Sequence, residues 1–365
     1  MTILFGAMLV LLAVFLIVRL YPPLGAKAAG SRLQAVHSSA HYAKNKFVNL
    51  IPTSMNAGFR DMLSAGKDMI RGIPNSRPRR GETAGKLNPA DLENAAQSKV
   101  IWLGHSSLLV QINGLTLLLD PMFGTAPSPV PFVGGKRYSD TPPADVKDLP
   151  PIDAVLLSHD HYDHLDYGTI RKLRSKVGHF FVPLGVGAHL ERWGVPAEKI
   201  TEADWWDELG LQGLKLFCAP SRHFSGRSLT DRNTTLWCSW VLDGGQERIF
   251  FSGDSGYGPH FQEIGKRYGP FDLTLMECGQ YNERWAAIHM LPEETVQAHQ
   301  DVGGKLLLPI HWGAFTLSLH AWTEPVERAV AAAEKQGVAI ATPRIGEPVL
   351  LGRPPHSSTR WWRKG

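Results

Sequence analysis

The hexapeptide His159–His164, with the sequence HDHYDH, follows the apolar segment Ala154–Ser158 and constrains this chain more than any other feature. Three imidazoles and two carboxylates in six residues cannot form a core segment, because so many buried polar groups would need partners. A loop at the carboxyl end of a strand can hold them, and this mixture of donors suits borderline divalent metals. The simpler alternative is a hydrophilic turn without function. The close spacing of three histidines and two carboxylates in the sequence disfavours it.

Two metal ions need more ligands than this loop supplies, and the sequence offers them after other apolar segments. The further donors are His223 after 214–219, Asp254 after 248–252 and His311 after 306–310. Each residue alone is more typical of a surface position. Because all of them follow predicted strands, we expect them to converge on one rim of the fold.

Short apolar segments separated by turns predict strands from Val100 onward, with Asn113-Gly114 as a hairpin turn. The expected strands are 100–103, 107–112, 115–120, 154–158, 179–182, 214–219, 236–242, 248–252, 273–277 and 306–310. Helical patterns lie near 165–175, 187–193, 293–302 and 326–336. Strands with interspersed helices predict a layered α/β protein with its helices outside.

The length of 365 residues and an apolar fraction of 43% allow a sizeable core, which excludes a disordered or collagen-like chain. Three scattered cysteines are too few for a disulfide scaffold. We divide the chain into an apolar membrane anchor or signal (1–24), a basic irregular linker (25–95) and a hydrolase domain (96–355).

The N-terminal segment predicts membrane association. Residues 3–18 carry no charged side chain, and the run approaches the ~20 residues that a spanning helix needs. A secretory signal cleaved near Ala26-Lys27-Ala28 is the alternative, but no Lys or Arg precedes the run. Positive charge after the run favours an uncleaved anchor with a cytoplasmic body, while a periplasmic or secreted body stays open.

Charge is distributed unevenly along the chain. Residues 19–86 hold 12 Lys and Arg against 3 Asp and Glu, whereas residues 87–365 hold 26 against 31. A basic N-terminal part on an acidic body fits anionic lipid headgroups, with a solvated basic linker as the equal alternative. The acidic body argues against nucleic acid as a partner. The sequence gives no oligomeric state.

The HxHxDH loop, followed by a His, a Gly-Asp and a final His, resembles the metallo-β-lactamase superfamily. The resemblance implies a four-layer αββα sandwich with a dinuclear site along one edge of its sheets. It further implies that His159, His161 and His223 bind the first metal, that Asp163, His164 and His311 bind the second, and that Asp254 bridges both.

Other motifs resemble the N-acyl-phosphatidylethanolamine-hydrolysing phospholipase D family. They are WLGHSS at 102–107, GDSGY at 253–257, HMLPEE at 289–294 and IHWGAF at 310–315. The resemblance implies a phospholipid substrate, with His289 and Tyr281 as substrate-binding residues. The same strands also resemble the UlaG-like lactonase branch, so a lactonase or another soluble phosphodiester hydrolase is the alternative function.

The implied chemistry uses two zinc ions, with iron or manganese also compatible with these ligands. A metal-bridged hydroxide would attack phosphorus, with Asp163 and Asp254 as the catalytic carboxylates. His105 lies at a strand end near the same rim, and we expect a structural or orienting role there. Asp160 and Asp166 are either partners of imidazole N–H groups or solvated loop acids.

Overall fold

A computed structural model describes residue 5 and residues 20–53, 63–64, 66–68, 71–79, 83, 85–132, 135–352 and 359–363. Most of the predicted anchor or signal over 1–24 lies outside the described residues. The same is true of most of residues 59–70, where the sequence also has a helical pattern. Among the helices that are described, none combines the length and the apolar character needed to cross a bilayer.

The first of two large sheets has seven strands in the order β15-β3-β4-β5-β6-β7-β8. Strands β15, β3, β4 and β5 pair antiparallel, whereas β5 to β8 are parallel. Their bounds are β3 Lys99–Trp102, β4 Leu108–Ile112, β5 Leu115–Leu119, β6 Ile152–Leu156, β7 Val177–Pro183, β8 Ile200–Ala203 and β15 Pro348–Leu350.

The second sheet has six strands in the order β14-β13-β12-β11-β10-β9. Strands β9 to β12 pair antiparallel, and β12, β13 and β14 run parallel. Their bounds are β9 Glu208–Leu211, β10 Leu214–Ala219, β11 Ser239–Asp243, β12 Arg248–Phe251, β13 Leu273–Glu277 and β14 Leu307–Ile310.

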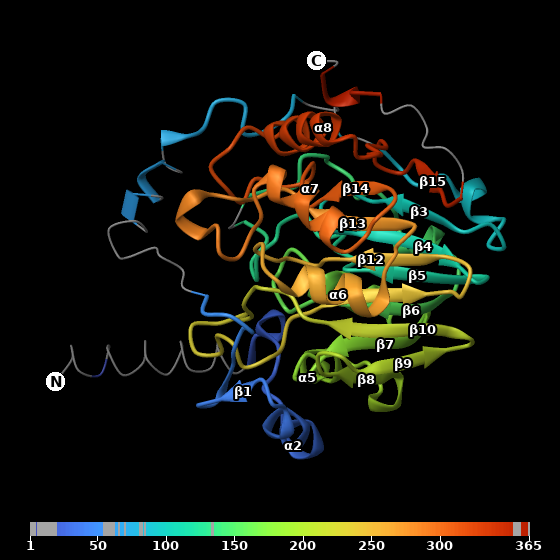
Figure 1. Cartoon of the computed structure of the whole chain (residues 1–365). Helices are drawn as coiled ribbons and strands as arrows, with labels where there is room; N and C mark the ends of the chain where they lie inside the picture. Colours follow the sequence, from blue (N-terminus) through green and yellow to red (C-terminus); the bar gives the residue numbers. More distant parts are fainter. Residues whose placement is uncertain are drawn as a thin grey trace.

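The two sheets pack face to face with helices on their outer faces, which gives the predicted mixed α/β layering (Figure 1). Helices α4 (Tyr167–Leu173) and α5 (Gly187–Arg192) cover the seven-stranded sheet. Helices α6 (His260–Tyr268) and α7 (Pro292–Asp301) cover the other sheet. Helix α8 (Glu324–Gln336) packs beside α7 and contributes to the core between the sheets.

The central strands are buried on both faces, so their side chains do not alternate between apolar and polar. Every residue of β4 and β5 is buried. Their hairpin turns at Asn113-Gly114 as predicted, with φ of 52° and 76° at the two turn residues. Such positive angles at both central positions are typical of the turn that matches strand twist.

One strand begins later than the sequence pattern predicts. Residues 236–238 were expected in β11, but the strand starts at Ser239. The amides of Leu236 and Cys238 donate instead to the carbonyls of Leu184 and Ser158 in the other half of the sandwich. These hydrogen bonds take the backbone out of the ladder and join the two halves.

A second connection between the sheets lies beside the loop that follows β3. The His105 amide donates to the Trp312 carbonyl over 3.0 Å, and the His311 amide donates to the His105 carbonyl over 2.9 Å. The end of β3 in one sheet is thus hydrogen-bonded to the end of β14 in the other.

The N-terminal part of the chain contains regular structure within the range 25–95, which the sequence analysis treated as irregular. Helix α2 (Gly30–Ser38) is followed by a hairpin of β1 (Tyr42–Ala43) and β2 (Lys46–Phe47). Phe47 is fully buried in the core, and the Asn49 side chain donates to the His223 carbonyl. This segment therefore packs against the body and reaches the strand-end rim.

Candidate metal centre

The residues predicted to bind metal lie at one edge of the sandwich, where strands of both sheets end. The loop after β6 carries His159, His161, Asp163 and His164, and the segments after β10, β12 and β14 carry His223, Asp254 and His311. The structure brings all seven together in overlapping groups, in each of which the donor atoms lie within 4.8 Å of one another.

Three imidazoles form one side of this cluster, which we call the histidine group: His159, His161 and His223. The Nδ1 atom of His161 lies 2.9 Å from His159 Nε2 and 3.2 Å from His223 Nε2. The outer Nδ1 of His223 faces the Ile288 carbonyl at 3.0 Å, and that of His159 faces Ser158 Oγ at 2.9 Å. These outer contacts leave an Nε2 lone pair of both rings directed inward.

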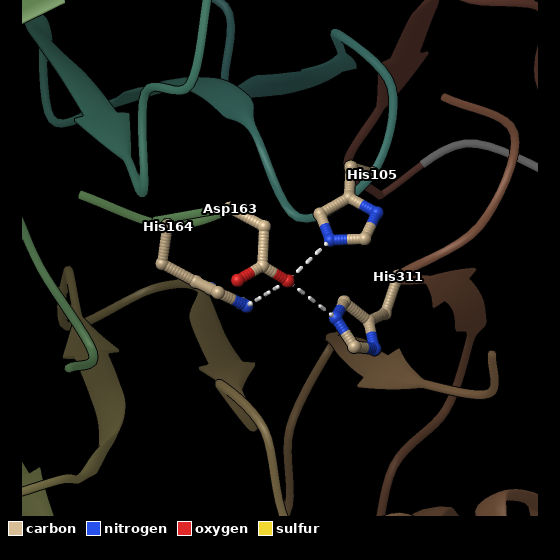
Figure 2. Close-up of side chains that lie close together, drawn as sticks. All are labelled: His105, Asp163, His164 and His311. Atoms are coloured by element: carbon tan, nitrogen blue, oxygen red, sulfur yellow. Dashed lines mark hydrogen bonds and ion pairs between the residues drawn. The ribbon is translucent and has the colours of Figure 1, made fainter. Parts of the chain in front are cut away.

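Four side chains form the other side, which we call the mixed group: His105, Asp163, His164 and His311 (Figure 2). The Asp163 Oδ2 atom lies 2.9 Å from His105 Nε2, 3.3 Å from His311 Nε2 and 3.5 Å from His164 Nε2. One carboxylate oxygen therefore faces three imidazoles, as the dashed lines in Figure 2 show.

Asp254 lies between the two groups. Its Oδ2 atom is 3.1 Å from His164 Nε2 and 3.3 Å from His311 Nε2 in the mixed group. The same atom is 3.9 Å from His159 Nε2 and 3.8 Å from His223 Nε2 in the histidine group. Its Oδ1 atom is buried and has no hydrogen-bond partner among the described residues. A buried carboxylate oxygen without a hydrogen-bond partner is the ligand atom expected of a residue that bridges two metal ions.

The electrostatics of the two groups differ. Burial, and then the neighbouring imidazoles, hold the pKa values of His159 and His223 well below the usual range for histidine. Burial alone would also lower the pKa of His311, but Asp254, Asp163 and Glu277 raise it to about 10. Burial opposes ionisation of Asp254 as well, but the surrounding imidazoles hold its pKa well below its ordinary value.

This donor set fits divalent metal. The histidine group presents neutral imidazoles and Asp254 an ionised carboxylate, which are the forms that bind zinc and related ions, whereas His311 would release its proton when a metal binds. The Oδ1 atom of Asp254 is buried without a hydrogen-bond partner among the described residues, and the imidazole nitrogens of the histidine group face one another. A bound metal would explain why these polar atoms are buried.

Comparison with known proteins agrees with this geometry. A family model described as the β-lactamase superfamily domain matches residues 116–312. The chain belongs to this superfamily. It is a metal-dependent hydrolase, as the sequence predicted.

Relatives of known sequence extend over more of the chain. An uncharacterised protein of Mycobacterium tuberculosis is 43% identical over 351 residues, covering 93% of this chain and 91% of its own length. N-acyl-phosphatidylethanolamine-hydrolyzing phospholipase D 1 of Caenorhabditis elegans is 35% identical over 228 residues, covering 59% of this chain and 64% of its own length. The solved structure of isothiocyanate hydrolase from Delia radicum gut bacteria has a TM-score of 0.55 at 20% identity, covering 69% and 98% respectively.

Two buried carboxylates that sequence reasoning missed support the imidazoles of this superfamily site. Asp120 directly follows β5 and lies 2.7 Å from His164 Nδ1, while Ser158 Oγ and the Ser158 amide donate to it. Glu277 ends β13 and lies 2.8 Å from His289 Nδ1 and 3.5 Å from His311 Nδ1. Asp120 and Glu277 each stand at the end of a predicted strand, and this position is the signal that the sequence offers. A single acidic residue at a strand end is common, so the position alone does not identify a site residue.

His105 takes a position consistent with the expected orienting role, because its Nε2 contacts the Asp163 carboxylate. The two loop acids differ from each other. Asp160 is buried and accepts from the Gly226 amide and Thr235 Oγ1, whereas Asp166 caps helix α4 by accepting from the Thr169 amide.

The two residues predicted to bind substrate lie in different surroundings. The His289 ring lies 5.0 Å from the His223 ring and 5.2 Å from the His311 ring, so it borders the metal centre. The Tyr281 hydroxyl donates to Glu324 Oε1 over 2.6 Å, and its ring stacks on His320. Tyr281 lines a separate cavity of about 610 Å³, and no candidate metal ligand is among the described residues around it.

Proposed function

We propose that the chain is a dinuclear metal-dependent phosphodiesterase that hydrolyses N-acyl-phosphatidylethanolamine-type phospholipids in a phospholipase D reaction. The observation that carries the proposal is the position of Asp254, whose Oδ2 faces two imidazoles of each donor group within 3.9 Å. The resemblance around 102–107, 253–257 and 310–315 and the nematode relative support the lipid substrate.

Two zinc ions suit these donors, and iron or manganese also fits. The histidine group would hold one ion, Asp163, His164 and His311 would hold the other, and Asp254 would contact both. When bound, such a pair of ions activates water near neutral pH and stabilises charge on phosphoryl oxygens.

The chain's own residues fix the positions of these donors. Asp120 and Ser158 orient two of the imidazoles from behind, so little rearrangement is needed at the centre. Glu277 is fully buried and contacts His289 Nδ1, which leaves Nε2 outside this contact, and the His289 side chain is partly exposed. We assign His289 to bind the phosphoryl group of the substrate, and Tyr281 to the lining of the neighbouring cavity.

The proposal includes attachment to the membrane through the N-terminal apolar run and the basic residues that follow it. A lipid substrate would then lie in the same surface as the anchored enzyme. Deletion of residues 1–19 should release the protein from membranes while diester hydrolysis continues. A truncated form that still sediments with uncharged vesicles, which the remaining basic residues do not attract, would contradict the anchor.

The substrate is tested by incubating the purified full chain with N-acyl-phosphatidylethanolamine in mixed micelles and, separately, with bis-p-nitrophenyl phosphate. The expected result is release of N-acylethanolamine and phosphatidic acid, detected by mass spectrometry. Hydrolysis of the aryl diester without lipid turnover would favour the soluble-substrate alternative. Failure of both reactions in metal-loaded protein would refute the phosphodiesterase proposal.

A further inference from the structure

Arg227 is a buried cation whose hydrogen bonds go to backbone carbonyls. The side chain is only 3% exposed, and burial lowers its pKa. Its Nη1 donates to the carbonyls of Asp160 (2.5 Å) and Leu165 (2.9 Å), and its Nε and Nη2 donate to Pro23 (3.0 and 2.8 Å). Because a buried donor without an acceptor is costly, all three carbonyls are needed to keep this guanidinium in place.

Two of these carbonyls lie in the loop 159–165, one between candidate metal ligands and one directly after the last of them. Asp160 separates His159 from His161, and Leu165 follows His164. The guanidinium carbon lies 4.0 Å from the centroid of the Tyr162 ring, which adds a contact in the middle of the loop. Arg227 therefore restrains the backbone that carries four of the seven candidate ligands.

The third carbonyl belongs to a segment that we call the strap, residues 22–26, which precedes helix α2. The Pro22 carbonyl accepts from Trp193 Nε1 over 2.7 Å, and the Ala26 amide donates to His189 Nδ1 over 2.9 Å. Gly25 has φ of 75°, and a Cβ atom there would lie 2.1 Å from His189 Nδ1. Only glycine fits this approach of the strap to the body.

His189 provides a second connection from the strap to the metal-binding loop. Because its Nδ1 accepts from the Ala26 amide, its Nε2 carries the hydrogen and donates to Asp160 Oδ2 over 3.3 Å. The Asp160 carbonyl is bound by Arg227 and its carboxylate by His189. The residue between two candidate ligands is thus held from both sides by groups that also hold the strap.

We propose that Arg227 is a positioning residue, which connects the strap to the loop 159–165 and thereby sets the affinity of that loop for metal. The inference rests on the proposed metal centre, but not on the identity of the substrate. It predicts that a change in the strap, far from the ligands in sequence, weakens metal binding.

The test compares zinc affinities of full-length variants in detergent, measured on metal-free protein by competition with a chromophoric chelator. Gly25→Ala places a methyl group against His189, whereas the matched control Gly30→Ala has a similar φ of 55° and no atom within 4 Å of its Cβ. Arg227→Lys keeps the charge but cannot bridge three carbonyls, and Arg248→Lys on β12 is its control. Replacing partners that orient ligands costs about 10- to 100-fold in metal affinity, so we expect at least a tenfold loss for Gly25→Ala and Arg227→Lys.

The controls should stay within twofold of the unaltered chain, and saturating zinc should restore kcat of the two test variants toward normal with KM unchanged. Equal affinities in the test and control variants would overturn the proposal. If Gly25→Ala does not fold, Arg227→Lys against Arg248→Lys decides in the same way. If the unaltered chain binds zinc but hydrolyses no diester, the proposed function is refuted. The zinc affinities of the variants can still be compared, so this inference is tested independently.

Discussion

The histidine group and the mixed group both place candidate metal ligands at the same edge of the sandwich, but they do so with different chemical groups. In the histidine group the nearest carboxylate oxygen, that of Asp254, lies 3.8 to 3.9 Å from His223 and His159. In the mixed group, Asp163 contacts three imidazoles and Asp120 stands behind His164. The first side therefore offers neutral nitrogens, which favour zinc, and the second offers nitrogen and charged oxygen, which also accept manganese or iron. In the proposed dinuclear centre, the two positions therefore need not bind the same ion equally well.

The largest expected effect comes from removing the residue that the two groups share. Asp254→Asn should lower kcat/KM for bis-p-nitrophenyl phosphate by about a thousandfold or more, a loss of about 4 kcal/mol in transition-state stabilisation. Metal content, measured by mass spectrometry, should fall at both positions. Retained turnover with full metal content would remove Asp254 from the centre, and His179→Asn on β7 serves as a control outside it.

A smaller effect should be confined to one side. Asp120→Asn removes the charged partner of His164 Nδ1 and should weaken one metal position by about 10- to 100-fold. The histidine group should retain its ion, because Asp120 is hydrogen-bonded to neither His161 nor His223 and is connected to His159 through Ser158 Oγ. Titration of metal-free protein with zinc would then show one strong and one weakened step. Two equally weakened steps would contradict the division into two groups.

Replacing His105 should weaken metal binding less than replacing Asp120, because His105 contacts the candidate ligand Asp163 from one side only. His105→Asn removes the Nε2 contact with Asp163 and is expected to weaken the mixed group by roughly tenfold, at the low end for partners of metal ligands. Manganese should be lost before zinc from the variant during dialysis. A variant that loses the ion of the histidine group first would reverse the assignment of His105.

The smallest effect concerns the stability of metal-free protein at different pH values. The folded pKa of His311 is raised to about 10, so its contribution to stability is complete below pH 6.5 and declines as pH rises toward 10. The pKa of His223 is lowered, so its contribution is complete above pH 6.5 and declines at acid pH. Urea unfolding of His311→Gln should therefore show a larger loss at pH 6 than at pH 9, and His223→Gln the opposite trend. Parallel trends in the two variants would contradict the electrostatic difference.

The sequence predicted much of this arrangement because strand ends carry the chemistry. A run of apolar residues followed by HDHYDH identifies both the strand and the loop, and the same logic applies to His223, Asp254 and His311. Six residues from distant parts of the chain cannot be paired in this way from one sequence. The contacts Asp120 to His164, Glu277 to His289 and His105 to Asp163 depend on how the two sheets pack.

Two expectations depended on tertiary contacts that no local pattern encodes. Tyr281 follows β13 like a site residue, and its surroundings depend on α8, because its hydroxyl donates to Glu324 and both residues line the separate cavity. The range 25–95 has many prolines and few apolar runs, yet Phe47 enters the core, and the strap at its start is joined to the loop 159–165 through Arg227. Such segments are ordered by the surface that they cover rather than by their own propensity.

The hydrogen bonds between His105 and the backbone of residues 311 and 312 have a consequence for how the protein acquires its ions. They join the segments that carry His105 and His311 through the chain's own amides, a connection that needs no ion. Uptake would then be an exchange reaction of folded protein, in which the composition of the surrounding metal pool decides the occupant. A chain purified from a zinc-rich medium could differ in content from one purified from a manganese-rich medium, with no difference in its fold.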